Sequence, residues 1–358
     1  MNKNIILYLR DEINNNEFRT PLTPKDIKIL INNNFTLYVR SSENRIYSDV
    51  EYYMEGAIIT NDPWYDSKFS DALIIGLKEI DNLHKLNRHN HIYFSHSFKN
   101  QHNSYDILNA FYKSSSNIYD FEYFLDNKNN NKRIIAFGFY AGIVGCILGI
   151  LQYLTKKIYG NNIENLKPYE NEEDMINRIL QLASFDISKL NIGIIGATGN
   201  CGKGVITILD KLGIPYNNAR LDSNDFNQKS LANFDIFYNC ILLNEKYDDV
   251  FFDSNTIFNK YITIVDISCD YLMENNPIKL YNNHTTWDSP VFNYNNFVDI
   301  IAINNLPSLL PKDSSNYFSE KFVDLLLDFK KDNNNYWKNN KKIFKKKISN
   351  FNMLCNYK

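Results

Sequence analysis

A short stretch near the middle of the chain places the strongest constraint on its fold. Residues 192–204 read IGIIGATGNCGKG, an apolar run followed by spaced glycines, and an apolar-periodic segment comes next. That order predicts a strand, a glycine turn and a helix. Glycines allow a tight turn and let backbone N–H groups approach a pyrophosphate, whose charge the helix N-terminus favours. The stretch therefore predicts a dinucleotide site, and a glycine turn that binds nothing is the alternative reading.

An acidic residue downstream indicates which dinucleotide the turn would take. Asp222 lies 20 residues past Gly202, at the end of a possible strand at 216–221. A carboxylate there can accept hydrogen bonds from an adenosine ribose and would repel a 2′-phosphate. We therefore expect NAD rather than NADP as the cofactor. The spacing is G-x-x-G-x-x-G instead of the strict G-x-G-x-x-G, so the motif does not decide the matter alone.

Length, charge and cysteine usage exclude several classes of protein. A chain of 358 residues is long enough for two domains, and a net charge of −2 gives no general attraction to nucleic acid or to an anionic membrane. The five cysteines are scattered without a C-x-x-C motif, so neither a metal site nor a disulfide framework is expected. The N-terminus reads as a strand and not as a signal peptide. We expect a cytoplasmic monomer with a small-molecule substrate.

One segment could be mistaken for a membrane span. Residues 134–151 are apolar almost throughout and carry glycines at helix-packing spacing. We interpret the segment as a strand at 133–137 that enters a buried helix, because polar globular patterns lie on both sides of it. No membrane partner is expected.

Short apolar strands alternate with amphipathic helices along the chain. It opens with a strand at 5–9, a loop, a helix with Thr23 as N-cap and Pro24 at its first position, and a strand at 35–39. Further strands are expected at 72–77, 92–94, 118–124, 235–242, 262–267 and 298–303, and helices at 105–112, at 139–157 and around Phe318 to Phe329. This alternation predicts an α/β fold with mainly parallel sheets.

The two halves predict two domains. We assign residues 136–311 to an NAD-binding domain. Residues 1–135 are assigned with 312–358 to a discontinuous, substrate-side domain, because the C-terminal segment is expected to return to the first unit. In parallel sheets, ligands bind outside the carboxyl ends of the strands, so the residues just past each strand matter most.

Lys78 and His96 follow two such strands and are the candidate acid and base. A partly desolvated lysine can have its pKa lowered toward neutrality, and a histidine already titrates there. The alternatives are a solvated lysine paired with Glu79 and a hydrogen-bonded structural histidine.

Arginines in the same half could bind carboxylates. Arg19 and Arg133 could each clamp a carboxylate through paired hydrogen bonds, or could be ordinary surface and strand-edge residues. Lys99 and Gln101 are open to the same two readings.

Eight segments, in the right order and spanning nearly the full chain, resemble the lysine-forming, NAD-dependent saccharopine dehydrogenases of the fungal type. That family is part of the alanine dehydrogenase/transhydrogenase-like superfamily. The segments are LYLRxE…ExRxxLTP (7–24), IIGLKE (74–79), HIxFxHxxKxQ (91–101), YDxE (119–122), RxxAFGFYAG (133–142), IIGAxGxCGxG (194–204), NCIxL (239–243) and LPSLLP (306–311).

The resemblance implies two Rossmann-like domains with the active site in the cleft between them. It implies oxidation of saccharopine at its secondary amine by NAD, followed by hydrolysis of the imine to lysine and 2-oxoglutarate. By position, His96 resembles the residue that handles the amine proton and Lys78 the one that assists imine hydrolysis. The positions that match the substrate site are Arg19, Lys99, Gln101, Arg133 and Phe137, and those that match the cofactor site are Gly199, Asn200, Asp222, Ile303, Asn304, Asn305 and Leu306.

The resemblance also identifies a cysteine pair and some departures. Cys201 and Cys240 match two family cysteines that can form a disulfide, and we expect free thiols in a reducing compartment. Asn304 and Asn305 stand where the family has Asp-His, and Asn14 replaces a lysine. These changes leave two alternatives open, an NAD-binding homologue with lost or altered catalysis and an alanine-dehydrogenase-like enzyme.

Overall fold

The computed structural model describes residues 4–98, 103–126, 131–182, 185–218, 228–241, 249–271, 273–330 and 335–355. The chain divides into two compact units. Unit 1 comprises Met1–Ala136 and Pro311–Lys358, and unit 2 comprises Phe137–Leu310.

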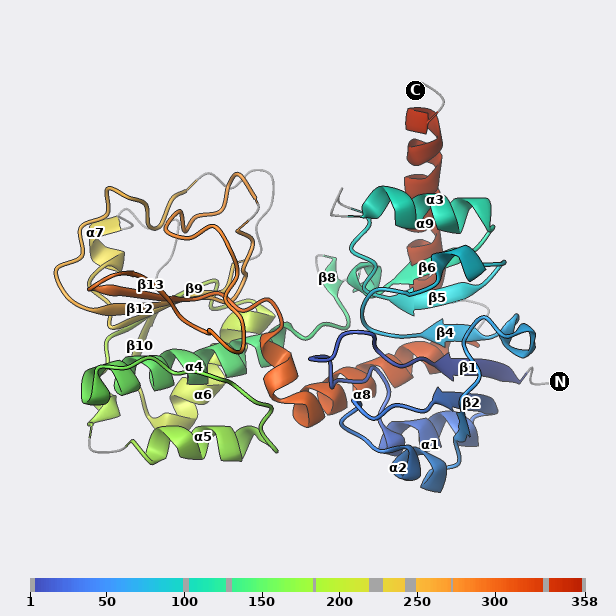
Figure 1. Cartoon of the computed structure of the whole chain (residues 1–358), viewed down its shortest axis with the longest axis horizontal. Helices are drawn as coiled ribbons and strands as arrows, with labels where there is room; N and C mark the ends of the chain where they lie inside the picture. The colour runs from blue at the N-terminus through green and yellow to red at the C-terminus, as the bar shows by residue number, and fades with distance from the viewer. Residues whose placement is uncertain are drawn as a thin grey trace. The chain divides into compact units, whose positions relative to one another are not determined.

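Unit 1 is built on a sheet of six parallel strands (Figure 1). The spatial order is β3-β2-β1-β4-β5-β6. The order reverses between β1 and β4, because the chain runs outward from β1 to β3 and then returns to the other side of β1. Ligands of such sheets bind at this switch point, beyond the carboxyl ends of the strands. The strands are β1 (Ile5–Leu9), β2 (Phe35–Arg40), β3 (Ile58–Thr60), β4 (Leu73–Ile75), β5 (Asn90–Tyr93) and β6 (Asn117–Asp120).

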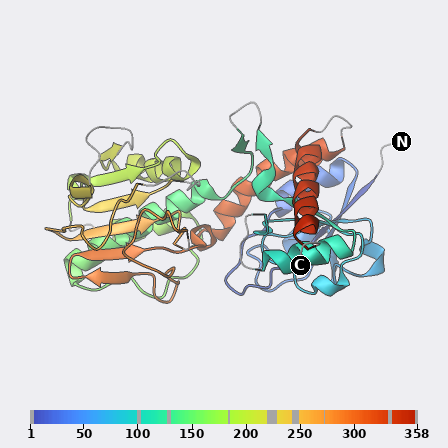
Figure 2. The ribbon, with the colours of Figure 1, turned by 90° about the horizontal axis from the view of Figure 1, so that it is seen from above.

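The helices of unit 1 come from both ends of the chain. Helix α8, drawn in orange-red in Figures 1 and 2, packs against α1, and helix α9, drawn in red, packs against β6 and α3. Two serines of α8 also bond the loop after β1, since the hydroxyl of Ser315 accepts from the Thr20 N–H at 2.9 Å and that of Ser319 from the Thr23 N–H at 3.0 Å. The helices are α1 (Pro24–Asn32), α2 (Asp49–Met54), α3 (Ser104–Lys113), α8 (Pro311–Phe329) and α9 (Asn335–Cys355).

The start of α1 differs in one detail from the sequence-based expectation. Thr23 is the N-cap and Pro24 is the first helical residue, but the Thr23 side chain makes no cap hydrogen bond. Its hydroxyl donates instead to the carboxylate of Asp26 at 2.9 Å. Ile27 and Leu30 of this helix are buried, and Ile31 is half-buried.

Unit 2 has a second six-stranded sheet, with the order β10-β9-β11-β12-β14-β13. All its pairings are parallel except that of β13 with β14. The order reverses between β9 and β11, which flank the glycine turn. The strands are β9 (Ile192–Ile195), β10 (Tyr216–Asn218), β11 (Ile236–Asn239), β12 (Ile262–Asp266), β13 (Phe292–Asn295) and β14 (Val298–Ile301). The expectation of an α/β fold with parallel sheets is confirmed.

Helix α4 (Gly138–Tyr159) is the core helix of unit 2. Within the described residues it is long and apolar enough to cross a membrane, but 72% of its most apolar window is buried. A Cβ at Gly142 would overlap the Cys201 carbonyl oxygen of α6 (Asn200–Leu212), so glycine permits the close approach of the two helices. The segment before α4 departs from the prediction of a strand at 133–137. Only β8 (Lys132–Arg133) is extended there, paired with β7 (Leu125–Asp126), and Phe137 caps α4.

Candidate active site

The carboxyl edge of the unit 1 sheet brings together residues that are far apart in the sequence. Beyond the last paired residues of β4 and β5, the Gly76 N–H donates to the Ile92 carbonyl at 3.0 Å, and the Phe94 N–H donates to the Leu77 carbonyl at 3.1 Å. The segments that carry Lys78 and His96 therefore leave the same edge from neighbouring strands. The loop after β1 leaves from the strand on the other side of β4.

Lys78 is half-buried at this edge. Burial lowers the pKa of its ammonium group, and the positive charge of Arg19 lowers it further. The carboxylates of Glu17, Glu79 and Glu12 raise the pKa, but they do not cancel these two effects. Desolvation and a nearby like charge both favour the neutral amine. The side chain is thus suited to exchange protons closer to neutrality than an exposed lysine does.

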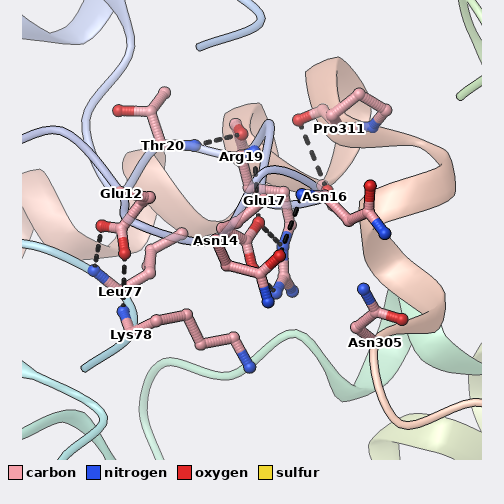
Figure 3. Close-up of polar contacts among 12 residues, drawn as sticks. Glu12, Asn14, Asn16, Glu17, Arg19, Thr20, Leu77, Lys78, Asn305 and Pro311 are labelled. Atoms are coloured by element: carbon pink, nitrogen blue, oxygen red, sulfur yellow. Dashed lines mark hydrogen bonds and ion pairs between the residues drawn. The ribbon is translucent and has the colours of Figure 1, made fainter. Parts of the chain in front are cut away.

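Glu17 and Arg19 form a buried ion pair in the loop after β1 (Figure 3). The Arg19 Nε and Nη2 atoms donate to the two carboxylate oxygens of Glu17 at 2.7 and 2.6 Å, and the Arg19 N–H also donates to Oε1 at 3.2 Å. Burial raises the pKa of Glu17, but the charge and hydrogen bonds of Arg19 outweigh that effect and hold the pKa below its usual value. This two-point contact fixes the plane of the guanidinium.

A small pocket opens beside this pair. Arginines and glutamates dominate its lining, so it suits a charged or strongly polar group. The lining residues are Arg10, Glu12, Glu17, Arg19, Thr20, Pro21, Ser42 and Arg45.

His96 lies just past β5 in an uncommon backbone conformation. Its φ is +48°, in the left-handed region that residues with a Cβ rarely adopt, and such residues cluster at active sites. The imidazole is half-buried and stacks on Phe94 with ring centroids 6.3 Å apart. Next to it, the Ser95 hydroxyl donates to the buried carboxylate of Asp120 at 2.6 Å. Burial raises the pKa of Asp120 to about 6 against the lowering effect of this hydrogen bond.

Arg133 is held by a carboxylate at the same edge. Its Nη2 donates to Glu122, which follows β6, at 3.0 Å. The side chains of Glu122 and Arg133 are 14% and 29% exposed, so the pair remains accessible to solvent.

The glycine turn of unit 2 has the features of a phosphate cradle. Gly196, directly after β9, has a φ of +82°, and a Cβ at Gly202 would overlap the backbone of Gly196 and Ala197. Glycine is therefore required at both positions. Gly199 caps α6 without a side chain, and Asn200 is its first residue. The N–H groups of this first turn are available to an anion, and the residues fit a dinucleotide phosphate.

The strand ends next to the turn carry a cysteine and a polar network. Cys201 and Cys240 are free thiols whose side chains interact, and burial raises the pKa of Cys240. The Asn239 amide donates to the buried Asp266 carboxylate at 2.9 Å, and the Tyr281 hydroxyl donates to it at 2.5 Å.

The four predicted cofactor residues in the loop after β14 differ in their exposure to solvent. Ile303 and Leu306 are buried, whereas Asn304 is exposed. The Asn305 amide oxygen accepts a hydrogen bond from the Trp287 indole at 3.1 Å.

The structure thus places Lys78, His96, Arg19 and Arg133 at or next to one edge of the unit 1 sheet. Phe137, the turn residues and the loop 303–306 lie in unit 2. Lys99, Gln101 and Asp222 lie outside the described residues. Sequence reasoning gave no role to Glu12, Glu17 or Glu122, although each lies just past a strand or within two residues of an arginine in the quoted motifs.

Comparison with known proteins gives the family. Residues 8–144 match the family described as "Alanine dehydrogenase/PNT, N-terminal domain". The chain is 33% identical to saccharopine dehydrogenase (NAD(+), L-lysine-forming) of Schizosaccharomyces pombe, over 94% of this chain and 97% of that protein. It is 34% identical to the enzyme of the same name from Candida glabrata, over 90% of this chain and 91% of that protein.

Solved structures share the fold at low sequence identity. An L-alanine dehydrogenase matches with a TM-score of 0.66 at 11% identity, covering 95% of this chain and 94% of that one. A transhydrogenase from Sinorhizobium meliloti matches with a TM-score of 0.66 at 14% identity, covering 90% and 94%.

Proposed function

The chain belongs to the NAD-dependent, lysine-forming saccharopine dehydrogenases, and from that premise we propose that it oxidises saccharopine with NAD to L-lysine and 2-oxoglutarate. The observation that supports the proposal best is the grouping of Lys78, His96 and the Glu17–Arg19 pair at one sheet edge. Side chains that can donate or accept protons lie there beside the guanidinium of Arg19, a type of group that binds carboxylates.

The reaction consists of an oxidation and a hydrolysis, and both steps involve proton transfers. The nitrogen of the secondary amine of saccharopine loses a proton, and the adjacent carbon of its glutarate part loses a hydride, which leaves a carbon–nitrogen double bond. NAD, when bound, accepts the hydride. Water then adds to the imine carbon, and cleavage of the carbon–nitrogen bond leaves a carbonyl on one product and a primary amine on lysine.

We assign the proton transfers to His96 and Lys78. His96 takes the proton of the secondary amine, and Lys78 moves protons to and from the attacking water during imine hydrolysis. The lowered pKa of Lys78 supports this role, because a general base works best when its pKa lies near the working pH. Its half-buried position supports it as well, since burial is what disfavours the charged form.

We assign the carboxylates of the substrate to the basic residues of unit 1. Arg19, Arg133, Lys99 and Gln101 are the proposed ligands, with Phe137 supplying an apolar contact. The bidentate contact from Glu17 supports the assignment of Arg19, because a guanidinium of fixed plane loses little freedom when it binds.

We assign NAD to the glycine turn of unit 2. Gly199 and Asn200 would hold the pyrophosphate through the first turn of α6, and Asp222 would bond the adenosine ribose. The proposed contacts of the loop 303–306 include the exposed Asn304. We further propose that the protein is a cytoplasmic monomer. Light scattering of the purified protein would test the oligomeric state.

Steady-state assays test the proposal directly. Purified protein should form NADH from NAD and saccharopine, and should consume NADH with lysine and 2-oxoglutarate. Lys78→Met should lower kcat about 10²- to 10⁴-fold, the usual contribution of a general acid or base. NADH binding without turnover of saccharopine would instead indicate lost catalysis, and turnover of pyruvate with ammonia would indicate an alanine-dehydrogenase-like enzyme.

A further inference from the structure

The carboxylate of Glu12 binds the peptide backbone of Lys78 (Figure 3). Its Oε1 accepts from the Leu77 N–H at 2.6 Å, and its Oε2 accepts from the Lys78 N–H at 2.9 Å. These two N–H groups lie beyond the paired residues of β4, which ends at Ile75. They therefore take their partner from a side chain and not from a neighbouring strand.

Arg10 binds the next peptide group along the chain. Its Nη2 donates to the Lys78 carbonyl oxygen, and its Nη1 lies 3.6 Å from the Glu12 carboxylate. A Cβ at Gly76 would overlap the Arg10 guanidinium, so glycine makes room for the arginine. The N–H and the carbonyl of Lys78 are thus both held by one ion pair, whose side chains are only 3% and 7% exposed.

Burying this pair is costly. Burial raises the pKa of Glu12 despite the Arg10 charge and the two backbone hydrogen bonds. Buried ion pairs can often be replaced by well-packed apolar residues without loss of stability, so folding alone does not require one here. The pair bonds the peptide of the one lysine to which the proposed reaction assigns proton transfer.

We propose that Arg10 and Glu12 are positioning residues, which fix the main chain of Lys78 and so direct its ammonium group toward the reacting atoms. This inference rests on the proposed saccharopine dehydrogenase activity. With the N–H and the carbonyl both held, only the side-chain torsions of Lys78 stay free. A shift of about 1 Å in a reacting group can cost roughly 100-fold in rate.

Glu12→Gln tests the inference, with Asp11→Asn as the matched control. The amide introduced at position 12 keeps the shape of the side chain but presents an NH2 group to one of the two N–H donors. Asp11 is the neighbouring carboxylate, and its side chain is 52% exposed. The measurements are hydrogen exchange of the Leu77 and Lys78 amides, kcat and KM for saccharopine and NAD, and the pH dependence of kcat/KM.

Glu12→Gln should lose exchange protection at Leu77 and Lys78 and lower kcat about 10- to 100-fold. The KM for NAD should stay within about twofold, and the limb of the pH profile that depends on Lys78 should move. Asp11→Asn should change none of these quantities. Glu12→Gln protein that matches Asp11→Asn in exchange, kcat and pH profile would overturn the inference.

Two further arms keep the test decisive. Wild-type protein that cannot oxidise saccharopine would reject the proposed function, while the exchange experiment would still show whether Glu12 holds the backbone. If circular dichroism shows that Glu12→Gln is unfolded, Arg10→Lys replaces it, because lysine keeps the charge but lacks the fork that bonds Glu12 and the Lys78 carbonyl. The inference then requires the same loss of kcat and the same shift of the pH profile in Arg10→Lys, and an unchanged kcat and pH profile would overturn it.

Discussion

Replacing the carboxylate of Glu17 tests the buried ion pair of the loop after β1. Glu17 and Arg19 are 2% and 5% exposed and share two short hydrogen bonds. Glu17→Gln keeps the size of the side chain but removes the carboxylate charge from a buried ion pair, and breaking such a pair costs about 3–5 kcal/mol. For a unit of this size, each kcal/mol lowers Tm by about 2–4 °C. We therefore expect Glu17→Gln to lower the Tm of unit 1 by about 6–20 °C.

The pH dependence provides an internal check. Because Arg19 holds the pKa of Glu17 below its unfolded value, the pair stabilises the protein above that unfolded value, and the stabilisation is lost as the pH falls through the folded pKa. The gap in Tm between wild type and Glu17→Gln should therefore be full at pH 7 and should close under acidic conditions. Thermal unfolding followed by circular dichroism measures it, with the exposed Glu43→Gln as control. A Glu17→Gln protein as stable at pH 7 as Glu43→Gln would refute the reasoning.

Three further predictions concern other parts of the chain. Gly142→Ala should destabilise unit 2 by about 1–3 kcal/mol or more, because its Cβ would overlap a backbone carbonyl. Gly138→Ala should be tolerated, since the nearest atom to its Cβ would lie at 3.8 Å. Equal urea midpoints for the two variants would contradict this expectation. Burial lowers the pKa of His91 well below its usual value, so stability should fall by up to about 1.4 kcal/mol per pH unit as the pH drops below about 6.5, and His91→Phe should remove that slope in urea titrations. Asn304→Asp should raise kcat for saccharopine, because it restores the aspartate that the similar family has at this proposed cofactor position, and an unchanged kcat would show that the amide does not limit turnover.

The strands and long helices of the fold could be predicted because their apolar periodicity is strong. The strand predicted at 118–124 is too long. The strand ends at Asp120, because that residue caps a short 3-10 turn. Helix α2 was not predicted, although Ser48 and Glu51 form a capping box that marks its start. Several of its apolar residues are exposed, so the spacing of the apolar residues in this segment does not mark a buried helix face.

The placement of a candidate residue at the sheet edge was predictable where the residue follows a strand directly, as Lys78 and His96 do. The contacts of Glu12 could not be predicted, because its partners are backbone N–H groups that belong to a distant segment and carry no side-chain signature. The Glu17–Arg19 pair is local, but its burial depends on packing that one sequence does not reveal. Buried carboxylates that accept hydrogen bonds from the main chain are therefore identified from the structure and not from sequence motifs.

The return of α8 and α9 to unit 1 also sets an order of events during synthesis. All of unit 2 leaves the ribosome before Pro311, whereas unit 1 still lacks Ser315, Ser319 and the Asn340 side chain, which bonds the backbone of Asp120 on both sides. Domains fold as units during translation. Unit 1 is therefore completed after unit 2, because its β6 edge and the loop bearing Arg19 lack these partners until α8 and α9 have been made.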